Sequence, residues 1–333
     1  MRLLAVTNMY PTPQHPASGT FVEQQVKGLQ QIGLDVAVLF VNRLQNGMGV
    51  YRGLGRRIRE HVKSFRPDLI HVMYGGIMAD QVTRSVSNCP TVVTFHGSDL
   101  LGEHLSGRLR KLLAGYGVYA SWRAAKRANR VVVVSKVLQD ALLKKVRHKK
   151  VSIIPCGIDL DRFQPLDQKM CQARLGWDER VFHVLFPSHR ENTVKRFALA
   201  SAAVGALNRS GIRAEIHPLQ GVPNDEAPIW FNASDVLILT SQHEGSPTVI
   251  KESLACNLPI VSVDVGDVHE RIGGVAGCHL AGAQPEDLCL KLRDVYAGPR
   301  RIAGRDKVQE LSLTQIARRL HELYTETLTS IKS

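Results

Sequence analysis

Two glutamates separated by seven residues stand in the stretch EGSPTVIKE, at Glu244 and Glu252. The stretch follows the apolar run DVLILTS (235–241), which has the composition of a buried strand. Ser246 and Pro247 suit the N-cap and first turn of a helix, which would begin here with unpaired amide groups. Glu252 would lie within that helix, whereas Glu244 would stay in the loop before it. Two carboxylates held apart beside an anion-attracting helix end can accept hydrogen bonds from hydroxyl pairs, such as those of sugars and riboses.

A second pair of candidates lies in the stretch PSHRENTVKRF, which follows the apolar run FHVLFPS (182–188). Arg190 and Lys195 are cations that can stabilise a leaving group on which negative charge accumulates, such as a diphosphate. Arg196 is a third candidate for phosphate contact. The alternative for each is an ordinary solvated loop cation.

The first half of the chain holds two further stretches with candidate residues. The stretch TFHGSDL ends an apolar run (91–97) and presents His96, Gly97 and Asp99 at its end. Gly19 precedes a helical pattern, where a glycine lets a phosphate or an acceptor approach the backbone closely. A plain turn explains Gly19 about as well, and a lone histidine after a strand is more often structural.

The elements that must position these residues are short apolar runs that alternate with helical patterns. Such runs indicate parallel sheets with helices on both faces. The expected strands are 3–8, 35–41, 68–74, 91–97, 130–135, 151–157, 182–188, 214–219, 235–241, 259–265 and 277–282, and helical patterns lie near 194–209, 226–233, 248–256 and 285–296. Because such folds bind ligands at the carboxyl ends of their strands, the candidates should gather at two sheet edges that face one cleft.

The length and the repeated pattern predict two Rossmann-like domains of the α/β class. The pattern restarts after a polar stretch near Gly157 to Pro165. The first domain, on the acceptor side, would cover residues 1–160, and the second, which binds the donor, residues 161–310. Residues 311–333 carry a long helical pattern that could leave the second domain and pack back on the first.

Composition argues against several classes of protein. The six cysteines are scattered without a CxxC pair, which indicates neither a zinc site nor a disulfide framework and fits a reducing cytoplasm. No apolar stretch approaches the roughly 20 residues of a membrane span, and the first apolar run is far too short for a signal peptide. We therefore expect a cytoplasmic protein. Nothing in the sequence indicates its oligomeric state.

Positive charge is concentrated in the first half of the chain. Residues 1–150 hold 23 Lys and Arg against 8 Asp and Glu, a formal charge of +15, whereas the remaining residues hold 20 and 22, a charge of −2. Around Arg108 to Tyr116 basic side chains mix with bulky apolar ones, as in interfacial helices. We expect an anionic partner, either the inner face of the cytoplasmic membrane or a phosphate-bearing acceptor. A solvated basic face is the alternative, and the lack of a recognition motif argues against nucleic acid.

The blocks around these candidates resemble the retaining glycosyltransferases of the GT-B fold, specifically the large family four. The family's hallmark of a Glu, seven residues and a second Glu matches Glu244 and Glu252, and EGSPTVIKESLACNLPIVSVDVG is similar to its donor-site block. HGSD and the interdomain block VSIIPCGIDLDRF match in the same order. The chain departs from the family at Gly19, where many members have two glycines, at Arg196, where Gly is commoner, and at Cys156, where Asn is usual.

The resemblance implies a role for each candidate. Glu244 would contact hydroxyl groups of the donor sugar and Glu252 those of the ribose. Arg190 and Lys195 would hold the diphosphate, and His96 would lie close to the sugar. The full expected set is catalytic His96, Asp99, Arg190, Lys195 and Glu244, with donor-binding Gly19, Arg190, Lys195, Glu244, Gly245, Ser246, Pro247, Thr248, Val249 and Glu252.

The activity implied is that of a hexosyltransferase-type enzyme (EC 2.4). The resemblance implies retaining, front-face transfer without a metal or cofactor, from a UDP or GDP sugar to a lipid-linked or polysaccharide acceptor. Within the family the chain is most similar to bacterial enzymes that build polysaccharides or teichuronic-acid-like polymers. Two alternatives stay open: a nucleotide-sugar epimerase of the same fold, and a non-catalytic protein that binds a nucleotide sugar or polyanion.

Overall fold

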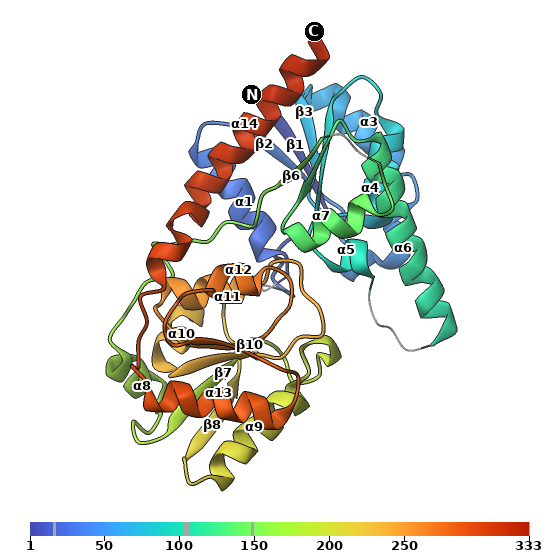
Figure 1. Cartoon of the computed structure of the whole chain (residues 1–333). Helices are drawn as coiled ribbons and strands as arrows, with labels where there is room; N and C mark the ends of the chain where they lie inside the picture. Colours follow the sequence, from blue (N-terminus) through green and yellow to red (C-terminus); the bar gives the residue numbers. More distant parts are fainter. Residues whose placement is uncertain (16–17, 103–106, 148–149, 333) are drawn as a thin grey trace. The chain divides into compact units, whose positions relative to one another are not determined.

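The computed structural model of the chain describes residues 1–15, 18–102, 107–147 and 150–332. The chain divides into two compact units (Figure 1). The first unit joins residues 1–157 to the C-terminal segment that begins at Leu313, and the second runs from Ile158 to Ser312. The chain therefore leaves the first unit once and returns to it for its last helix.

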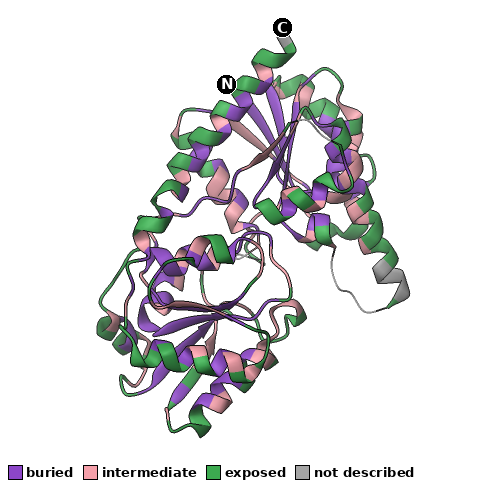
Figure 2. Ribbon diagram, in the orientation of Figure 1, coloured by how far each residue is buried: buried purple, intermediate pink, exposed green. Residues whose placement is uncertain are grey.

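Six parallel strands form the sheet of the first unit, in the order β2-β1-β3-β4-β5-β6. Their bounds are Arg2–Thr7 (β1), Asp35–Phe40 (β2), Leu69–Val72 (β3), Thr91–Phe95 (β4), Arg130–Val133 (β5) and Val151–Ile153 (β6). The central strands are apolar along almost their whole length because helices cover both faces of the sheet. Figure 2 shows these strands buried and the outer faces of the helices exposed.

The helices of the first unit lie on both sides of this sheet. They are α1 (Thr20–Gln31), α2 (Arg43–Asn46), η1 (Gly47–Tyr51), α3 (Leu54–Phe65), α4 (Gly76–Ser85), α5 (Ser98–Leu101), α6 (Arg108–Arg127), α7 (Lys136–Leu143) and α14 (Leu313–Lys332). Residues of α3, α4, α6 and α7 share one hydrophobic core with Leu4, Val6 and Val72 of the strands. Helix α14 packs on α1, closely enough that a Cβ on Gly28 would lie 3.2 Å from the Leu313 carbonyl oxygen.

A buried polar network ties α14 to the first sheet. The Tyr324 hydroxyl lies 2.6 Å from Nδ1 of His71, and Nε2 of His71 lies 2.6 Å from the Thr94 hydroxyl. Burial lowers the pKa of His71 to about 3, because the charged imidazolium would lose its hydration, and His96 adds a smaller effect in the same direction. The imidazole is therefore neutral and has a partner at each nitrogen.

Five parallel strands form the sheet of the second unit, in the order β11-β10-β9-β7-β8. Their bounds are Phe182–Phe186 (β7), Ala214–Pro218 (β8), Val236–Leu239 (β9), Ile260–Val263 (β10) and Cys278–Ala281 (β11). The helical elements are α8 (Gln168–Leu175), η2 (Thr193–Lys195), α9 (Phe197–Arg209), α10 (Ala227–Ala233), α11 (Thr248–Ala255), α12 (Val268–Ile272), α13 (Pro285–Ala297) and η3 (Arg305–Leu311). Helices α9 and α13 cover the sheet face that carries Val184, Val236 and Val261.

The predicted α/β class with two Rossmann-like parallel sheets is confirmed, and all eleven predicted strands are present. Most strands end earlier than predicted, because the residues after them turn into the loops of the site. The helix expected at 194–209 is interrupted at Arg196, whose φ of 52° ends η2 before α9 begins. No described helix is both long and apolar enough to cross a bilayer.

Candidate functional site

The strand order of the second sheet reverses at β7. The chain continues from β7 to β8 on one side, while β9 lies on the other side of β7. At such a switch point the loops that follow the two strands diverge and leave a crevice, where open α/β sheets bind ligands. Arg190 and Lys195 follow β7, and the stretch from Glu244 to Thr248 follows β9. The strand order thus brings the two strongest sequence candidates to one edge of the sheet.

Lys195 and Glu244 are in direct contact at this switch point. The ammonium Nζ of Lys195 donates to Oε1 of Glu244 at 2.5 Å. The two side chains are only 22% and 16% exposed, so water screens this pair less than it would a surface ion pair. An ammonium has three donors and a carboxylate two acceptor oxygens, so the pair can engage anionic and hydroxyl groups of one ligand at the same time.

Backbone contacts hold the two loops in register behind this pair. The amide of Gln242 donates to the Val194 carbonyl at 2.9 Å, and the Thr240 hydroxyl donates to the Lys195 carbonyl at 2.7 Å. The backbone on both sides of the Lys195 side chain is therefore attached to the end of β9. These contacts fix the backbone of Lys195 and therefore the position from which its side chain extends.

Arg196 supports the same junction. Its φ of 52° lies in the left-handed region, where glycine is favoured. Its guanidinium donates from Nε to the Thr240 carbonyl at 2.5 Å and from Nη2 to the Ser241 carbonyl at 3.0 Å. The structure thus gives Arg196 a structural role at the end of β9, and its phosphate contact stays a prediction.

Helix α11 begins one residue later than predicted. Pro247 is its N-cap residue and Thr248 its first helical residue. Ser246, the predicted N-cap, donates its hydroxyl to Oδ2 of Asp267 at 2.7 Å, and Arg271 donates to the same oxygen at 2.9 Å. Asp267 is buried, and a buried carboxylate requires such partners, which outweighs the capping preference of Ser246. No side chain caps α11, so its N-terminus keeps its attraction for anions.

The rest of the predicted donor block surrounds the start of α11. Thr248 and Val249 form its first turn and are half-buried. Gly245 packs against Gly266 in the loop after β10, where a Cβ would lie 2.7 Å from the Gly245 carbonyl oxygen. Gly266 also has a φ of 61°, so both the close backbone contact and the left-handed conformation favour glycine here. Two loops therefore pack backbone to backbone beside Glu244.

Glu252 lies one turn further along α11. Burial of its carboxyl raises the pKa to about 7, and the nearby charges of Arg162 and Lys251 oppose that shift. A carboxyl that titrates near neutral pH can accept a hydrogen bond when ionised and donate one when protonated. Perturbed groups of this kind are typical of functional sites, although structural networks also produce them.

Arg190 is the most exposed of the predicted donor contacts. Its guanidinium lies 5.1 Å from the centre of the Phe197 ring, in the first turn of α9. This cation–π contact holds the side chain on the loop that also carries Lys195. The side chain as a whole is exposed, so its guanidinium remains accessible to a ligand.

In the first unit, His96 and Asp99 follow β4. The Asp99 carboxylate accepts hydrogen bonds from the backbone amides of Gly75 at 3.0 Å, His96 at 3.0 Å and Gly97 at 2.8 Å. Burial raises the pKa of Asp99 to about 6, and these amides oppose the shift. Gly97 has a φ of 150°, which favours glycine. Asp99 thus shapes the loop that presents His96, which makes it a positioning residue.

The imidazole of His96 is held by aromatic rings on both sides. It stacks on Tyr74 with ring centres 5.9 Å apart and an interplanar angle of 10°, and its centre lies 4.6 Å from that of Phe21. Its Nδ1 lies 3.4 Å from Sγ of Cys156, the residue that replaces the asparagine usual in the family. These contacts restrict the orientation of the ring, which favours a preorganised role.

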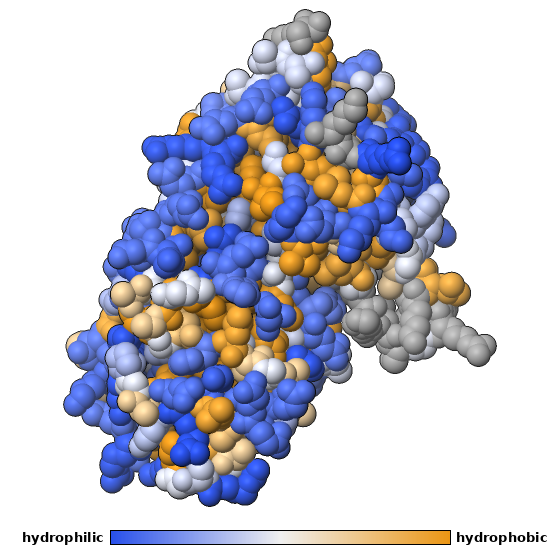
Figure 3. All heavy atoms as spheres, in the orientation of Figure 1, coloured by the Kyte–Doolittle hydropathy of each residue, from blue (hydrophilic) through white to orange (hydrophobic). Residues whose placement is uncertain are grey.

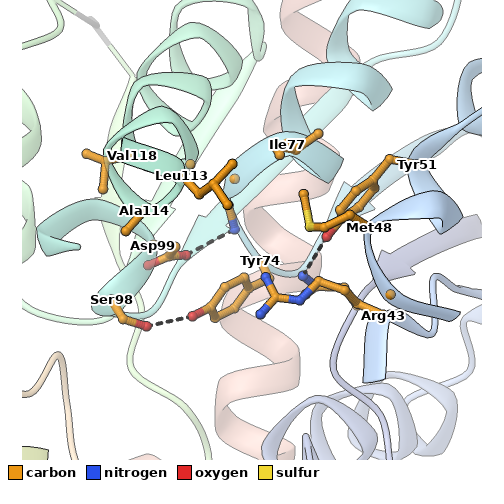
Figure 4. A pocket seen from close by; sticks show the side chains of 15 residues that line it. Arg43, Met48, Tyr51, Tyr74, Ile77, Ser98, Asp99, Leu113, Ala114 and Val118 are labelled. Carbon is orange, nitrogen blue, oxygen red and sulfur yellow. Dashed lines mark hydrogen bonds between the residues drawn. The ribbon is translucent and has the colours of Figure 1, made fainter. Parts of the chain in front are cut away.

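A pocket of about 320 Å³ opens beside Asp99 in the first unit (Figure 4). It lies where the loops after β1, β3 and β4 meet, and the order β2-β1-β3 makes β1 the switch point of this sheet. The Tyr74 hydroxyl lies 2.7 Å from the Ser98 hydroxyl, and Leu113 and Val118 contribute apolar surface from α6. Apolar walls with a few converging polar groups are typical of small-molecule sites.

Gly19 has a structural reason for its identity. It is the N-cap of α1 with a φ of 70°, and a Cβ at this position would overlap the Met9 carbonyl. The backbone after β1 thus packs directly on the start of α1. The structure gives no separate evidence for a donor contact at Gly19.

The comparisons with known families match both units of the chain. Residues 16–162 match the family described as Glycosyltransferase Family 4, and residues 183–297 match the Glycosyl transferases group 1 family. The chain belongs to glycosyltransferase family 4. One relative is TuaC of Bacillus subtilis (strain 168), which is named as a teichuronic acid biosynthesis glycosyltransferase. The two sequences are 28% identical, and the match covers 82% of this chain and 83% of TuaC.

Solved structures share the fold of this family-4 glycosyltransferase. Sucrose-phosphate synthase from Thermosynechococcus elongatus superimposes with a TM-score of 0.80 at 15% identity, over 99% of this chain and 100% of that one. HepE of Anabaena, solved in complex with UDP, superimposes with a TM-score of 0.72 at 17% identity, over 98% and 100%. These matches support the GT-B architecture on fold alone.

Sequence reasoning missed the pocket of the first unit and the support that Asp267 gives to Ser246. A local signal for the pocket existed, since two glycines, Gly75 and Gly76, follow a strand, and glycines at strand ends often mark a ligand crevice. No local signal could have paired Asp267 with Ser246, because their contact depends on how two loops pack.

Proposed function

We propose that this enzyme transfers a sugar, with retention of its anomeric configuration, from a nucleotide-diphosphate sugar to a hydroxyl group of an acceptor. The observation that carries this proposal is the contact between Lys195 and Glu244 at the switch point of the second sheet. One hydrogen bond joins a cation that can bind a diphosphate to a carboxylate that can bind sugar hydroxyl groups. The family match supports the reaction class.

Transfer proceeds on one face of the sugar. The bond from the anomeric carbon to the diphosphate oxygen breaks, and the diphosphate leaves with the electron pair. The acceptor oxygen bonds to the same face of the anomeric carbon, and its proton passes to the departing diphosphate. Lys195 and Arg190 stabilise the charge on that diphosphate, so no metal is needed. Glu244 orients the sugar, and His96 is the residue of the first unit that we assign to support the developing positive charge.

The donor is a UDP or GDP sugar. Glu252 accepts hydrogen bonds from the ribose hydroxyl groups, and the N-terminus of α11 faces the sugar and diphosphate. That HepE, which shares the fold, was solved with UDP supports UDP as the first nucleotide to test.

The acceptor is lipid-linked or a polysaccharide, and the pocket beside Asp99 receives part of it. The name of TuaC supports a role in building a bacterial surface polymer. An apolar wall from α6 suits an acceptor with an apolar portion, and the polar groups of Tyr74 and Ser98 suit its hydroxyls.

The exposed face of α6 supports binding of the enzyme to the inner face of the cytoplasmic membrane. Leu112 is 71% exposed, and Leu113, Tyr116 and Tyr119 are about half exposed. Figure 3 shows hydrophobic side chains among hydrophilic ones on the face of the first unit that it draws. Exposed leucines and tyrosines beside basic residues are typical of interfacial helices. The side chains of the basic residues predicted to flank them, Arg108, Arg110 and Lys111, lie outside the described part of the chain. Flotation with anionic but not neutral vesicles, weakened by salt, is the expected result.

Calorimetric titration with UDP, GDP, ADP and dTDP tests the donor site. One nucleotide should bind the wild-type protein selectively and bind Lys195→Ala and Glu252→Ala more weakly. Equal or absent binding in all three proteins would refute the site and favour the non-catalytic alternative. Product analysis with the selected sugar nucleotide then separates transfer from epimerisation, because an epimerase releases an altered sugar without any acceptor.

A further inference from the structure

Three metal-ligating side chains converge on the edge of the second sheet, apart from the donor loops. The ligand atoms of His183, Glu215 and His217 all lie within 4.8 Å of one another. We propose that these residues bind a divalent transition-metal cation at this edge of the sheet, with Zn²⁺ as the best fit. Two imidazoles and one carboxylate form a ligand set that Zn²⁺ takes in proteins, with a water molecule in the fourth position.

Strand register places the three side chains on one face. Strand β8 is the edge strand and pairs with β7 so that His183 lies opposite Glu215, and Leu185 opposite His217. Alternate residues of a strand point to the same face. Val184 and Ile216, which lie between them, pack into the core on the other face. The grouping of the three ligands therefore follows from the β7–β8 register and needs no special loop.

A backbone hydrogen bond sets the tautomer of His183. Its Nε2 lies 3.0 Å from the Asp178 carbonyl oxygen, which can only accept, so Nε2 carries the hydrogen. The lone pair of the neutral ring then lies on Nδ1, which faces Nε2 of His217 at 2.9 Å. Histidines that bind metals commonly donate their other N–H to a backbone carbonyl in this way.

The other two ligands, Glu215 and His217, are less buried than His183. The His217 ring stacks on Trp177 with centres 3.8 Å apart and an interplanar angle of 18°, which fixes the plane of the imidazole. Glu215 is exposed, so its carboxylate can move to meet a cation. Tetrahedral zinc holds two nitrogens roughly 3.3 Å apart, a few tenths of an ångström more than they are here. A small rotation of either ring therefore opens the site.

The location predicts a stabilising role and no part in the transfer. His183 is the second residue of β7, whereas Arg190 and Lys195 lie beyond the opposite end of that strand. A cation would clip the edge strand β8 to β7, with one ligand on β7 and two on β8. It should raise the stability of the second unit and leave nucleotide binding unchanged.

The test is calorimetric titration of EDTA-dialysed, tag-free protein with Zn²⁺, followed by thermal unfolding with and without Zn²⁺. The variants are His217→Gln, Glu215→Gln and the control His279→Gln, which changes a histidine on β11 at the opposite edge of the sheet. Co²⁺ gives a second readout, because tetrahedral Co²⁺ absorbs visible light strongly. Titration with UDP accompanies each variant.

We expect one Zn²⁺ per chain and a higher Tm for the wild-type protein and for His279→Gln. Binding should weaken by more than about tenfold in Glu215→Gln and disappear in His217→Gln. Absence of saturable binding, or equal binding in His217→Gln and wild type, would overturn the proposal and leave a hydrogen-bonded histidine pair. If UDP binding is unchanged in these variants, a change in Zn²⁺ binding cannot be attributed to damage at the proposed donor site.

Discussion

Lys195 is the residue on which the proposed chemistry depends most. It contacts Glu244 in this structure, and in the proposed reaction it stabilises the diphosphate as the glycosidic bond breaks. Because charge on the leaving group grows toward the transition state, its main effect should be on kcat. Lys195→Ala should lower kcat by about 10²- to 10³-fold with a smaller change in UDP affinity.

Steady-state kinetics and calorimetry on the same preparations measure both quantities. Lys195→Arg is the matched control, because it keeps the positive charge at the switch point and should retain more activity than the alanine variant. A defect confined to KM would contradict the assignment, since it would mean that the lysine stabilises ground state and transition state equally.

Glu252 makes stability depend on pH. Its pKa is raised to about 7 in the folded protein from 4.5, so the unfolded chain ionises it first as pH rises. Stability should fall between about pH 4.5 and 7, by at most about 3 kcal/mol, and stay level above that. Glu252→Gln removes this cost. Urea unfolding at pH 5 and pH 8 should show the wild type losing more stability than the variant between the two pH values, and equal losses would refute the assignment.

At the scale of elements, the junction of η2 and α9 is held by an arginine in a conformation that suits glycine. Arg196→Ala removes both hydrogen bonds to the end of β9 and keeps the left-handed backbone, which costs a non-glycine residue about 1–2 kcal/mol. Arg196→Gly removes the same bonds but relieves the backbone.

We therefore expect the alanine variant to be less stable than the glycine variant by about 1 kcal/mol, measured by urea unfolding. Nucleotide binding should weaken in both, because both remove two of the hydrogen bonds that hold the loop carrying Lys195 to the residues after β9. If the alanine variant proved the more stable of the two, the left-handed backbone would not limit this position.

At the scale of the whole molecule, the chain returns to its first unit through one helix. Tyr324→Phe removes the hydroxyl that meets Nδ1 of His71 and leaves a buried nitrogen without that partner, at a cost of about 1–3 kcal/mol. The first unit should lose stability, seen as faster hydrogen exchange in β3 and α14. UDP binding, which we propose depends on residues of the second unit, should not change. A matching loss of UDP affinity would contradict this division of roles.

The sequence by itself determined the elements and the local blocks of this protein. Eleven apolar runs predicted the eleven strands, and the Glu244 to Glu252 block appeared as a loop followed by a helix start. These features are readable because apolar periodicity and helix-start residues act within a few positions of one another.

Only the tertiary structure decided which of those residues meet. Lys195 and Glu244 are 49 positions apart and come together through the strand order at β7. The family blocks predicted Asp99 as a site residue, and only the structure shows that three backbone amides donate to its carboxylate. His183 and His217 stood in separate strands, and their register made them neighbours. Strand order and register arise from long-range packing of the whole sheet, which no short window of sequence records.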